Sequence, residues 1–356
     1  MLFDSLVLRD TTIRNRVWLP PMAQYTVANR DGVPNDWHLV HYGARAAQGF
    51  GLLVIEATGV VPEGRITVGD LGLWDDTQIE SFARVTTFCQ QYGAVVAVQL
   101  GHAGRKGSTW PDAPGNPSGV MSLDQGGFTP VAPSAIAFPG LREPHGLTTQ
   151  EVTQIPEDFA QAARRADQAG IDVVEIHAAH GYLLHQFYSP LSNYRDDAYG
   201  GDFNGRTRLV REVVEEVRKV WPESKPLFIR LSATEWVDDG WSLEDTIHLS
   251  ILLKDLGVDL IDVSSGGNIM TPIPSAPGYQ VDFAHAVRTE AGIPTSAVGQ
   301  ITDPLHAESI LDSGQADAIM IGREALRNPG WPEQAAAVLG VTTPMAAPLR
   351  RGALPR

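Results

Sequence analysis

Residues 227–264 contain a strand, a helix and a second strand, and they indicate how the whole chain folds. The unit opens on LFIRL (Leu227–Leu231), continues with LEDTIHLSILLKDL (Leu243–Leu256) and ends on LIDVS (Leu260–Ser264). Both short runs are apolar at nearly every position, as expected of parallel strands that are covered on both faces. The middle segment has the length and periodicity of a helix, and Gly257 follows it where a left-handed cap commonly ends one. The unit is therefore typical of a β–α–β crossover.

The same alternation recurs along the chain. Further strands are predicted at Arg16–Pro20, Leu52–Ala57, Val95–Leu100, Val173–His177, Thr295–Gly299 and Ala318–Gly322. Further helices are predicted at Trp37–Gln48, Thr77–Tyr92, Pro156–Ala169, Arg206–Val220, Asp282–Glu290 and Pro304–Asp312, with a last one beyond Arg323. Eight repeats of strand and helix predict a (β/α)8 TIM barrel in a single domain over residues 1–340. The alternative is a doubly wound open sheet, which would want a glycine-rich turn where this chain reads PPMAQYT (Pro20–Thr26).

Two segments interrupt the repeat. Residues 101–155, which follow the third strand, are rich in glycine, proline and serine. So long a connection in a compact domain usually serves function, and we expect it to form a wall of the substrate site rather than a solvated insertion. Residues 341–356 contain proline and arginine, and we expect a C-terminal tail that does not pack as a helix.

Composition excludes several classes of protein. The net charge is 27 − 42 = −15, which disfavours nucleic acid and anionic membranes as partners. Cys89 is the only cysteine, so we expect neither an internal disulfide nor a thiolate metal cluster, and we interpret Cys89 as an inert core residue. We find no signal peptide and no apolar run of the ~20 residues that a membrane span needs. The expected location is cytoplasmic.

Two glycines at the ends of the last two strands predict a phosphate site. Gly299 and Gly322 would let backbone N–H groups approach a phosphate, and Arg323 could add a bidentate guanidinium contact. The alternative is that these glycines only turn the chain.

Other polar groups gather at the end of the fourth strand, where barrel enzymes carry catalytic residues. His177 and His180 could bind a metal, and Glu175, which shares the in/out parity of His177, is the available third ligand. They could instead donate hydrogen bonds to one carbonyl oxygen or oxyanion. Because Tyr182 lies beside them, a purely structural role is disfavoured, and we expect an oxygen-binding site without a metal.

Seven motifs resemble one known family over nearly the whole chain, in order. They are PPMAQYT, EATGVVPEGRI, QLGHAGRK, EIHAAHGYLLHQFYSPLSNYRDDAYGG, FIRLSA, VGQIT and IGREALRNP. This series resembles the Old Yellow Enzyme family of FMN-dependent ene-reductases, in its bacterial branch with shorter loops. The fourth motif is highly specific.

The resemblance implies that FMN lies over the barrel mouth. Its ring would be lined by Pro21, Met22, Ala23 and Ala57, its pyrimidine edge would meet Gln99 and Arg230, and its phosphate would lie at Gly299, Gly322 and Arg323. Arg230 would stabilise the anionic reduced ring. The chain departs from the pattern at Ala23, where the branch commonly has a cysteine, and at Gly205, where the family usually has asparagine.

The resemblance also implies the reaction. NAD(P)H would reduce the flavin, which would then reduce the C=C bond of an activated alkene, an α,β-unsaturated carbonyl or nitro compound. His177 and His180 would bind the activating oxygen, Tyr182 would protonate the α-carbon, and Tyr25 would form part of the substrate wall. A homodimer or homotetramer is implied, with Arg351 in the tail completing the site of a neighbouring subunit.

Three other functions stay open at this point. A flavin-free aldolase or isomerase would need a lysine at a strand end, and none of the eight strand segments contains one. A metal-dependent hydrolase would use His177 and His180 as ligands. A non-catalytic flavin-binding or redox-sensing barrel would bind FMN without reducing an alkene.

Overall fold

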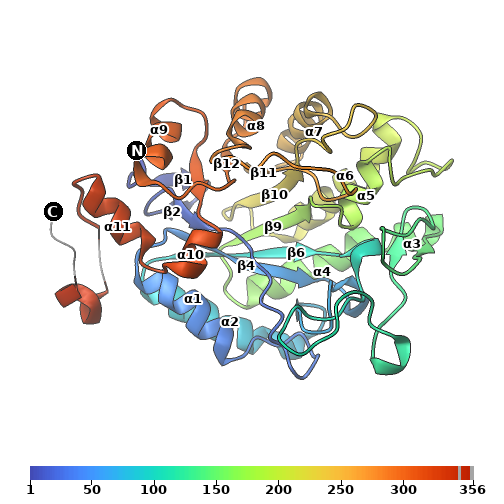
Figure 1. Cartoon of the computed structure of the whole chain (residues 1–356), viewed down its shortest axis with the longest axis horizontal. Coiled ribbons are helices and arrows are strands. Elements are labelled where there is room, and N and C mark those ends of the chain that lie inside the picture. Colours follow the sequence, from blue (N-terminus) through green and yellow to red (C-terminus); the bar gives the residue numbers. More distant parts are fainter. Residues whose placement is uncertain (344–345, 353–356) are drawn as a thin grey trace.

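Eight parallel strands close into a barrel in the computed structural model, which describes residues 1–343 and 346–352 (Figure 1). The strands are β3 (Val17–Leu19), β4 (Leu52–Gly59), β6 (Val95–Gly101), β9 (Val173–Ala178), β10 (Leu227–Ser232), β11 (Leu260–Ser264), β12 (Thr295–Ala297) and β13 (Ala318–Met320). Each pairs in parallel with the next, and β13 returns to β3 through the pair Ile319 and Val17. The predicted (β/α)8 barrel is confirmed, and the open-sheet alternative is wrong.

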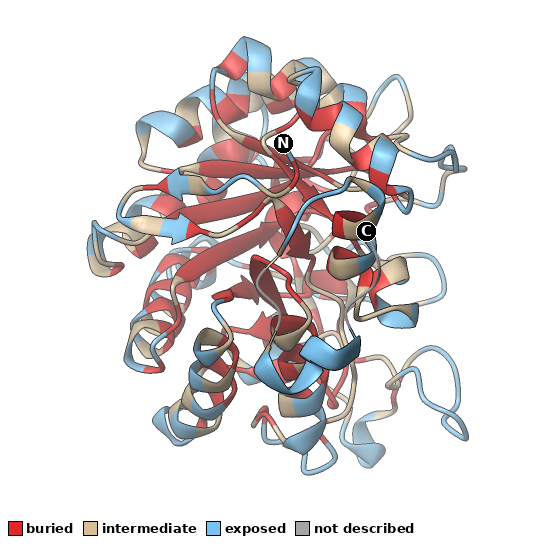
Figure 2. Ribbon diagram, turned by 90° about the vertical axis from the view of Figure 1, so that its left-hand side faces the viewer, coloured by how far each residue is buried: buried red, intermediate tan, exposed pale blue. Residues whose placement is uncertain are grey.

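Helices cover the outside of the barrel. They are α1 (Asp36–Ala47), α2 (Ile79–Gln91), α4 (Ile155–Gln168), α6 (Phe203–Val220), α7 (Leu243–Asp255), α8 (Val281–Ala286), α9 (Pro304–Asp312), α10 (Arg323–Arg327) and α11 (Trp331–Val338). Figure 2 shows buried strands at the centre, with exposed residues on the outer helices and loops. The longer helices bury apolar side chains against the barrel: α2 buries Phe82, Val85 and Cys89. Burial raises the pKa of the Cys89 thiol to about 12, as expected of an inert core residue.

A steric constraint accounts for the glycine in DFNGR. Gly205 lies in the first turn of α6, where its N–H donates to the capping carboxylate of Asp202 at 3.0 Å. A Cβ at this position would stand 1.9 Å from the carbonyl oxygen of Gly200, which is backbone and cannot rotate away. A side chain at position 205 would therefore require the backbone at Gly200 to shift.

The lower half of the barrel is filled by apolar side chains. Trp18 and Phe228 stack with ring centroids 5.8 Å apart, in a cluster of inward-facing strand residues. A hairpin of β1 (Leu6–Leu8) and β2 (Thr11–Ile13), which the sequence did not predict, adds Leu8 and Ile13 to this cluster. The amino-terminal end of the barrel is therefore closed, and open space lies at the other end.

Residues 101–155 carry small elements of their own between β6 and α4. They are the 3-10 turns η3 (Gly104–Lys106) and η4 (Leu123–Gln125), the strand pair β7 (Val131–Ala132) and β8 (His145–Gly146), and α3 (Thr149–Val152). Other short elements are η1 (Pro62–Gly64), β5 (Leu71–Gly72), η2 (Asp76–Gln78), α5 (Leu183–Tyr188) and the π-turn η5 (Val287–Ala291) that extends α8.

The tail contains one further short element. Residues Ala347–Gly352 form the exposed 3-10 turn η6, which carries Arg351 and lies beyond α11 in Figure 1. Residues 344–345 and 353–356, also part of the predicted tail, lie outside the described residues. Over the described ranges, the chain has no helix whose length and apolarity would let it cross a membrane.

Candidate active site

A cavity of about 520 Å³ opens at the carboxyl ends of the barrel strands. This volume lies within the range of small-molecule sites, roughly 300–1,000 Å³. Seven residues that the sequence predicted for the site line it: Pro21, Met22, His180, Arg230, Gly299, Gly322 and Arg323. The cavity thus joins the loop after β3 to the ends of β10, β12 and β13.

The two predicted glycines expose backbone at one end of this cavity. Gly299 has φ +134°, and a Cβ there would stand 3.1 Å from the ring of Tyr279. Gly322 immediately precedes Arg323, whose exposed side chain lies in the cavity wall together with Arg327. Because these two residues are glycines, no side chain covers their backbone, and two guanidinium groups lie beside it. This arrangement fits a phosphate group, although the chain as a whole is acidic.

Three aromatic rings meet at the ends of β9 and its following turn. The ring centroids of His177 and His180 are 5.4 Å apart with an interplanar angle of 88°, and those of His177 and Tyr182 are 4.9 Å apart at 77°. The backbone N–H of Ala179 donates to Nδ1 of His177 at 3.3 Å, so its Nε2 carries the proton. Nε2 of His180 lies 2.6 Å from Oγ of Ser264. Nε2 of His177 and Nδ1 of His180 are therefore available to bind a ligand.

Electrostatics keep these groups uncharged. Burial, followed by the positive charge of Arg230, holds the pKa of both His177 and His180 well below the ordinary value. Burial, and then Tyr25 and Asp70, raise the pKa of the Tyr182 phenol well above its ordinary value. At neutral pH the site thus presents two neutral imidazoles and a protonated phenol, a set suited to donating hydrogen bonds and a proton to an oxygen-bearing substrate.

The remaining predicted residues surround this centre at different depths. Ala57, His177 and Tyr182 line a small void of about 10 Å³, and Tyr25 lines a separate cavity of about 280 Å³ together with Thr109–Ala113 of the long insertion. Gln99 lies lower in the barrel, where Nε2 donates to Oε1 of Glu175 at 2.8 Å.

Like Gln99, two further predicted residues, Ala23 and Arg351, line none of these three cavities. Ala23 precedes Gln24, whose N–H donates to the buried Glu56 at 3.1 Å and anchors the loop after β3. Arg351 lies in the exposed turn η6, and this chain alone does not bring it to the centre.

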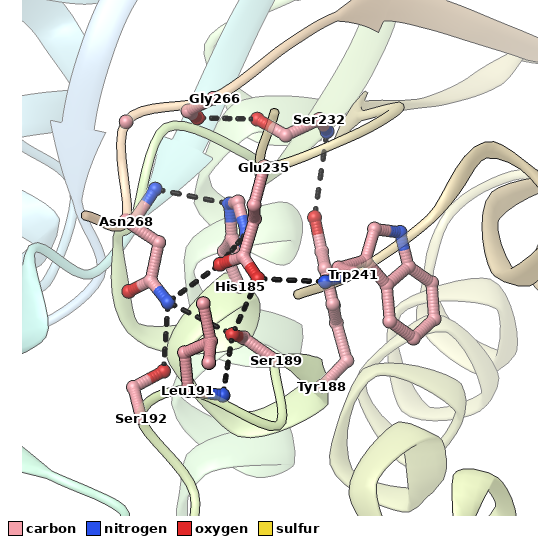
Figure 3. A network of polar contacts seen from close by, with 12 residues as sticks. His185, Tyr188, Ser189, Leu191, Ser192, Ser232, Glu235, Trp241, Gly266 and Asn268 are labelled. Atoms are coloured by element: carbon pink, nitrogen blue, oxygen red, sulfur yellow. Dashed lines mark hydrogen bonds and ion pairs between the residues drawn. The ribbon is translucent and has the colours of Figure 1, made fainter. Parts of the chain in front are cut away.

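A buried network that sequence reasoning missed fixes the turn at His180 (Figure 3). The N–H of Gly181 donates to Nδ1 of His185 at 3.0 Å, so Nε2 of His185 donates to Oε1 of Glu235 at 3.1 Å. Glu235 also accepts from Asn268 Nδ2 (2.7 Å), Trp241 N (2.7 Å) and Ser189 Oγ (2.9 Å).

The chemistry of this network is that of a fixed support. Burial alone would raise the pKa of Glu235, but its hydrogen bonds, led by that of His185, lower it to about 2. Burial lowers the pKa of His185. His185 could have been singled out from the motif HGYLLHQF. Nothing in the spacing of that motif indicates its partner Glu235, which is 50 residues further along the chain.

The barrel, the glycine cradle and the hydrogen-bonding centre define the class of barrel oxidoreductases that bind FMN. The chain belongs to the NADH:flavin oxidoreductase / NADH oxidase family, whose model matches residues 1–340. FMN and a nicotinamide donor are therefore its cofactors, and the family replaces the flavin-free and metal-hydrolase alternatives. Within residues 1–343 and 346–352, no group of three or more His, Cys, Asp or Glu is placed to hold a metal.

Individual relatives agree with this assignment and with the resemblance to Old Yellow Enzyme. The NADPH dehydrogenase of Halalkalibacterium halodurans is 44% identical over 96% of this chain and 95% of its own. That of Bacillus subtilis is 43% identical over 99% and 98%. Among solved structures, morphinone reductase is 30% identical with a TM-score of 0.78, covering 96% of this chain and 90% of that one. An Old Yellow Enzyme homologue from Zymomonas mobilis is 29% identical with a TM-score of 0.79, covering 96% and 94%.

Proposed function

We propose that this protein uses NAD(P)H to reduce the C=C bond of alkenes conjugated to a carbonyl or nitro group. The observation that carries the proposal is the meeting of two neutral imidazoles and one protonated phenol beside the cofactor cavity. FMN, when bound, supplies the two-electron chemistry that these side chains cannot perform. The side chains bind the substrate, polarise it and provide the proton.

The cofactor would be held along the length of the large cavity. The backbone at Gly299 and Gly322 and the guanidinium of Arg323 would bind its phosphate. Its ring would lie against four residues of the loop after β3 and of β4, which are Pro21, Met22, Ala23 and Ala57. Gln99 and Arg230 would approach the pyrimidine edge from below, where Arg230 is 6% exposed and offers a positive charge.

The substrate oxygen would be bound by Nε2 of His177 and Nδ1 of His180, the two ring nitrogens that have no hydrogen-bond partner in the described structure. Withdrawal of electron density toward this oxygen makes the β-carbon electrophilic. Tyr182 would then protonate the α-carbon, because its phenol is held protonated beside His177. Tyr25 would form a wall for the substrate, and Arg351 of a second subunit would complete it.

Turnover of a simple enone tests the proposal. Purified protein reconstituted with FMN should consume NAD(P)H and cyclohexenone in equal amounts under anaerobic conditions and yield cyclohexanone. The matched control is the same protein without the enone, which should reduce its FMN once and then stop. Flavin that is reduced by NAD(P)H and stays reduced in the presence of cyclohexenone and nitrostyrene would contradict the proposal and favour a non-catalytic or redox-sensing flavoprotein.

A further inference from the structure

Five polar side chains from consecutive strands form a layer inside the barrel. They are Gln99 on β6, Glu175 on β9, Arg230 on β10, Asp262 on β11 and Ser296 on β12, each no more than 6% exposed. Oγ of Ser296 donates to Oδ1 of Asp262 at 2.8 Å, and Nε of Arg230 lies 2.9 Å from Oδ2 of Asp262. We call these five residues the polar layer.

The polar layer lies between the apolar lower barrel and the cofactor cavity. Val173 on β9, Phe228 on β10 and Leu260 on β11 belong to the apolar cluster, each two residues before its strand's member of the layer. Arg230 also lines the large cavity. The polar layer thus forms the floor of the cavity, because Arg230 belongs to the layer and also lines the cavity.

The polar layer contains more carboxyl groups than cations. Glu175 and Asp262 share one guanidinium, so with both carboxyls ionised the layer would carry one net negative charge in a fully buried place. Oε2 of Glu175 has no hydrogen-bond partner in the described structure, and its other oxygen is bound only by the neutral amide of Gln99. Leaving an ionised carboxylate this poorly paired is costly, because burial strips its hydration without replacing it.

The groups that face Glu175 identify it as the group that changes protonation. Burial raises the pKa of Asp262 as well, but Arg230, whose Nε lies 2.9 Å from Oδ2, and the hydrogen bond from Ser296 oppose that rise, so Asp262 is the better stabilised carboxylate of the two. Gln99 does not titrate, and His177, two residues further on the same strand, is held neutral by burial and by Arg230. Burial, with the charge of Asp262, raises the pKa of Glu175 against the opposing effect of Arg230.

We propose that Glu175 couples reduction of the cofactor to proton uptake: at a pH where its carboxyl is ionised in the oxidised protein, the carboxylate takes up one proton from solvent when electrons enter the ring and releases it when they leave. The inference rests on the proposed placement of the ring beside Arg230. Two electrons and one proton reach the ring from NAD(P)H and leave it with one added negative charge near Arg230. Uptake of a second proton by Glu175 then makes the whole change two electrons and two protons, with no net charge added inside the barrel.

The pH dependence of the midpoint potential of bound FMN tests this proton count. Each proton taken up shifts a two-electron potential by about 30 mV per pH unit. Wild-type holoenzyme, titrated between pH 5.5 and 9.5, should show a segment with twice the single-proton slope at the alkaline pH values where Glu175 is ionised in the oxidised protein. Glu175→Gln, which keeps an acceptor for Gln99 but cannot ionise, should follow the single-proton slope throughout.

Glu56→Gln is the matched control. Glu56 is a buried carboxyl on β4, but both of its oxygens have partners, Gln24 N and Tyr42 Oη. This variant should keep the doubled slope. A doubled slope that survives in Glu175→Gln, or a single slope in the wild type, overturns the proposal.

Two further measurements separate the possible failures. If Glu175→Gln does not retain FMN, the wild type decides: its reduced-minus-oxidised infrared spectrum must contain a carboxylic acid C=O band that shifts in D₂O, and the absence of this band overturns the proposal. Arg230→Lys tests the placement of the ring. An unchanged potential and FMN affinity in Arg230→Lys refute the proposed placement of the ring. If Arg230→Lys changes the potential but the wild type shows only the single-proton slope, the role of Glu175 alone is refuted.

Discussion

His180 has a φ of +58°, a backbone conformation that residues other than glycine rarely adopt. Such a residue costs about 1–3 kcal/mol and persists only where its surroundings hold it. Its N–H donates to Oγ of Ser232 at 2.9 Å, and its carbonyl accepts from Nζ of Lys106 at 2.9 Å. The strain is therefore maintained by neighbouring strand ends, and it directs the imidazole toward His177 and the cavity.

Replacing both His177 and His180 with alanine should weaken phenol binding while FMN stays bound. Each lost hydrogen bond is worth about 1 kcal/mol, so the affinity should fall by about tenfold or less for each histidine. Titration of the flavin absorbance with a para-substituted phenol measures the change, and FMN content and reduction by NAD(P)H serve as controls. Stoichiometric zinc in the purified protein, with activity lost to a chelator, would show instead that the histidines bind a metal.

Replacing Tyr182 with phenylalanine should slow the oxidative half-reaction and leave the reductive one nearly unchanged. Removal of a general acid costs about 10²–10⁴ in the step that uses its proton. Stopped-flow measurement of each half-reaction, with cyclohexenone as oxidant, separates the two. A plain enone is required because water can protonate strongly activated nitroalkenes. Equal slowing of both halves would argue against the assigned role.

The turn after β9 is packed, backbone against backbone, on the loop after β11. A Cβ on Gly181 would stand 2.3 Å from the carbonyl oxygen of Gly267, and a Cβ on Gly267 would stand 2.6 Å from Cα of His180. Neither obstacle is a flexible side chain. Together with the Glu235 network of Figure 3, this contact makes the two loops one rigid unit beneath His180 and Tyr182.

Gly181→Ala should therefore destabilise the protein far more than Gly170→Ala. Gly181 and Gly170 have nearly equal φ, +71° and +76°, so the left-handed strain of about 1–2 kcal/mol is common to both. Only Gly181 meets backbone within 3 Å, whereas nothing lies within 4 Å of a Cβ at Gly170. Urea denaturation should show a loss of unfolding free energy for Gly181→Ala that exceeds the control by at least 2 kcal/mol, a typical cost of forced overpacking. Equal losses would mean that the two loops move apart easily.

Burial and length explain which elements could be predicted from the sequence. Strands such as Leu260–Ser264 are buried on both faces, so a short run dominated by branched apolar residues identifies them even with Asp262 inside it, and this one was predicted to the residue. The hairpin of β1 and β2 was missed because its strands have three residues each and one exposed position apiece. The helix expected beyond Arg323 is two helices, interrupted at Asn328–Gly330 where Gly330 begins the second.

The site follows the same division. His177 and His180 stand at a strand end, where chain order alone places them. His185 and Glu235 depend on a contact between loops that no local pattern encodes. Gln99 was predicted beside the cofactor, but it bonds Glu175 in the polar layer and lines none of the three cavities described.

At the scale of the whole molecule, five buried neutral histidines make stability depend on pH. Burial lowers the pKa of His41 to about 3 and that of His102 to about 4, and the pKa values of His177, His180 and His185 are lowered as well. In the unfolded chain these groups bind protons below about pH 6.5. For these groups the unfolded state then binds more protons than the native one, so their contribution to stability is full above pH 6.5 and is lost as pH falls toward 4. The carboxyls of Asp70 and Glu175, whose pKa burial raises, contribute with the opposite sign.

We expect the free energy of unfolding to fall by up to about 1.4 kcal/mol per pH unit for each such histidine. Urea titrations at pH 7.0, 6.0 and 5.0 with excess FMN measure the slope. His102→Asn removes one titrating group and keeps an acceptor for the N–H of Gly104, so its slope should be shallower than that of the wild type. Equal slopes for the wild type and His102→Asn would contradict the assignment of a neutral His102, because the opposing carboxyls Asp70 and Glu175 are common to both proteins.

The tail offers a test of assembly. Arg350 and Arg351 lie side by side in an exposed turn at the end of an acidic chain, and an anionic cofactor site is a specific target for one of them. Arg351→Ala, or truncation after Ala347, should raise KM for the enone by about tenfold, the worth of one charge-assisted hydrogen bond. Arg350→Ala is the matched control. Unchanged FMN content, oligomeric state and enone kinetics after truncation would show that the tail takes no part.

The hairpin of β1 and β2 bears on the route by which reactants enter and leave the barrel. Leu8 and Ile13 belong to the same apolar cluster as Trp18 and fill the amino-terminal end of the barrel, so under the proposed function both reactants would enter through the large cavity at the other end. Under the same proposal, a nicotinamide and an alkene would bind over the same face of the cofactor ring and would exclude each other. The donor must then depart before the acceptor enters, so double-reciprocal plots of initial rate should give parallel lines. Excess donor should inhibit by binding the reduced enzyme, and excess acceptor should inhibit by binding the oxidised enzyme.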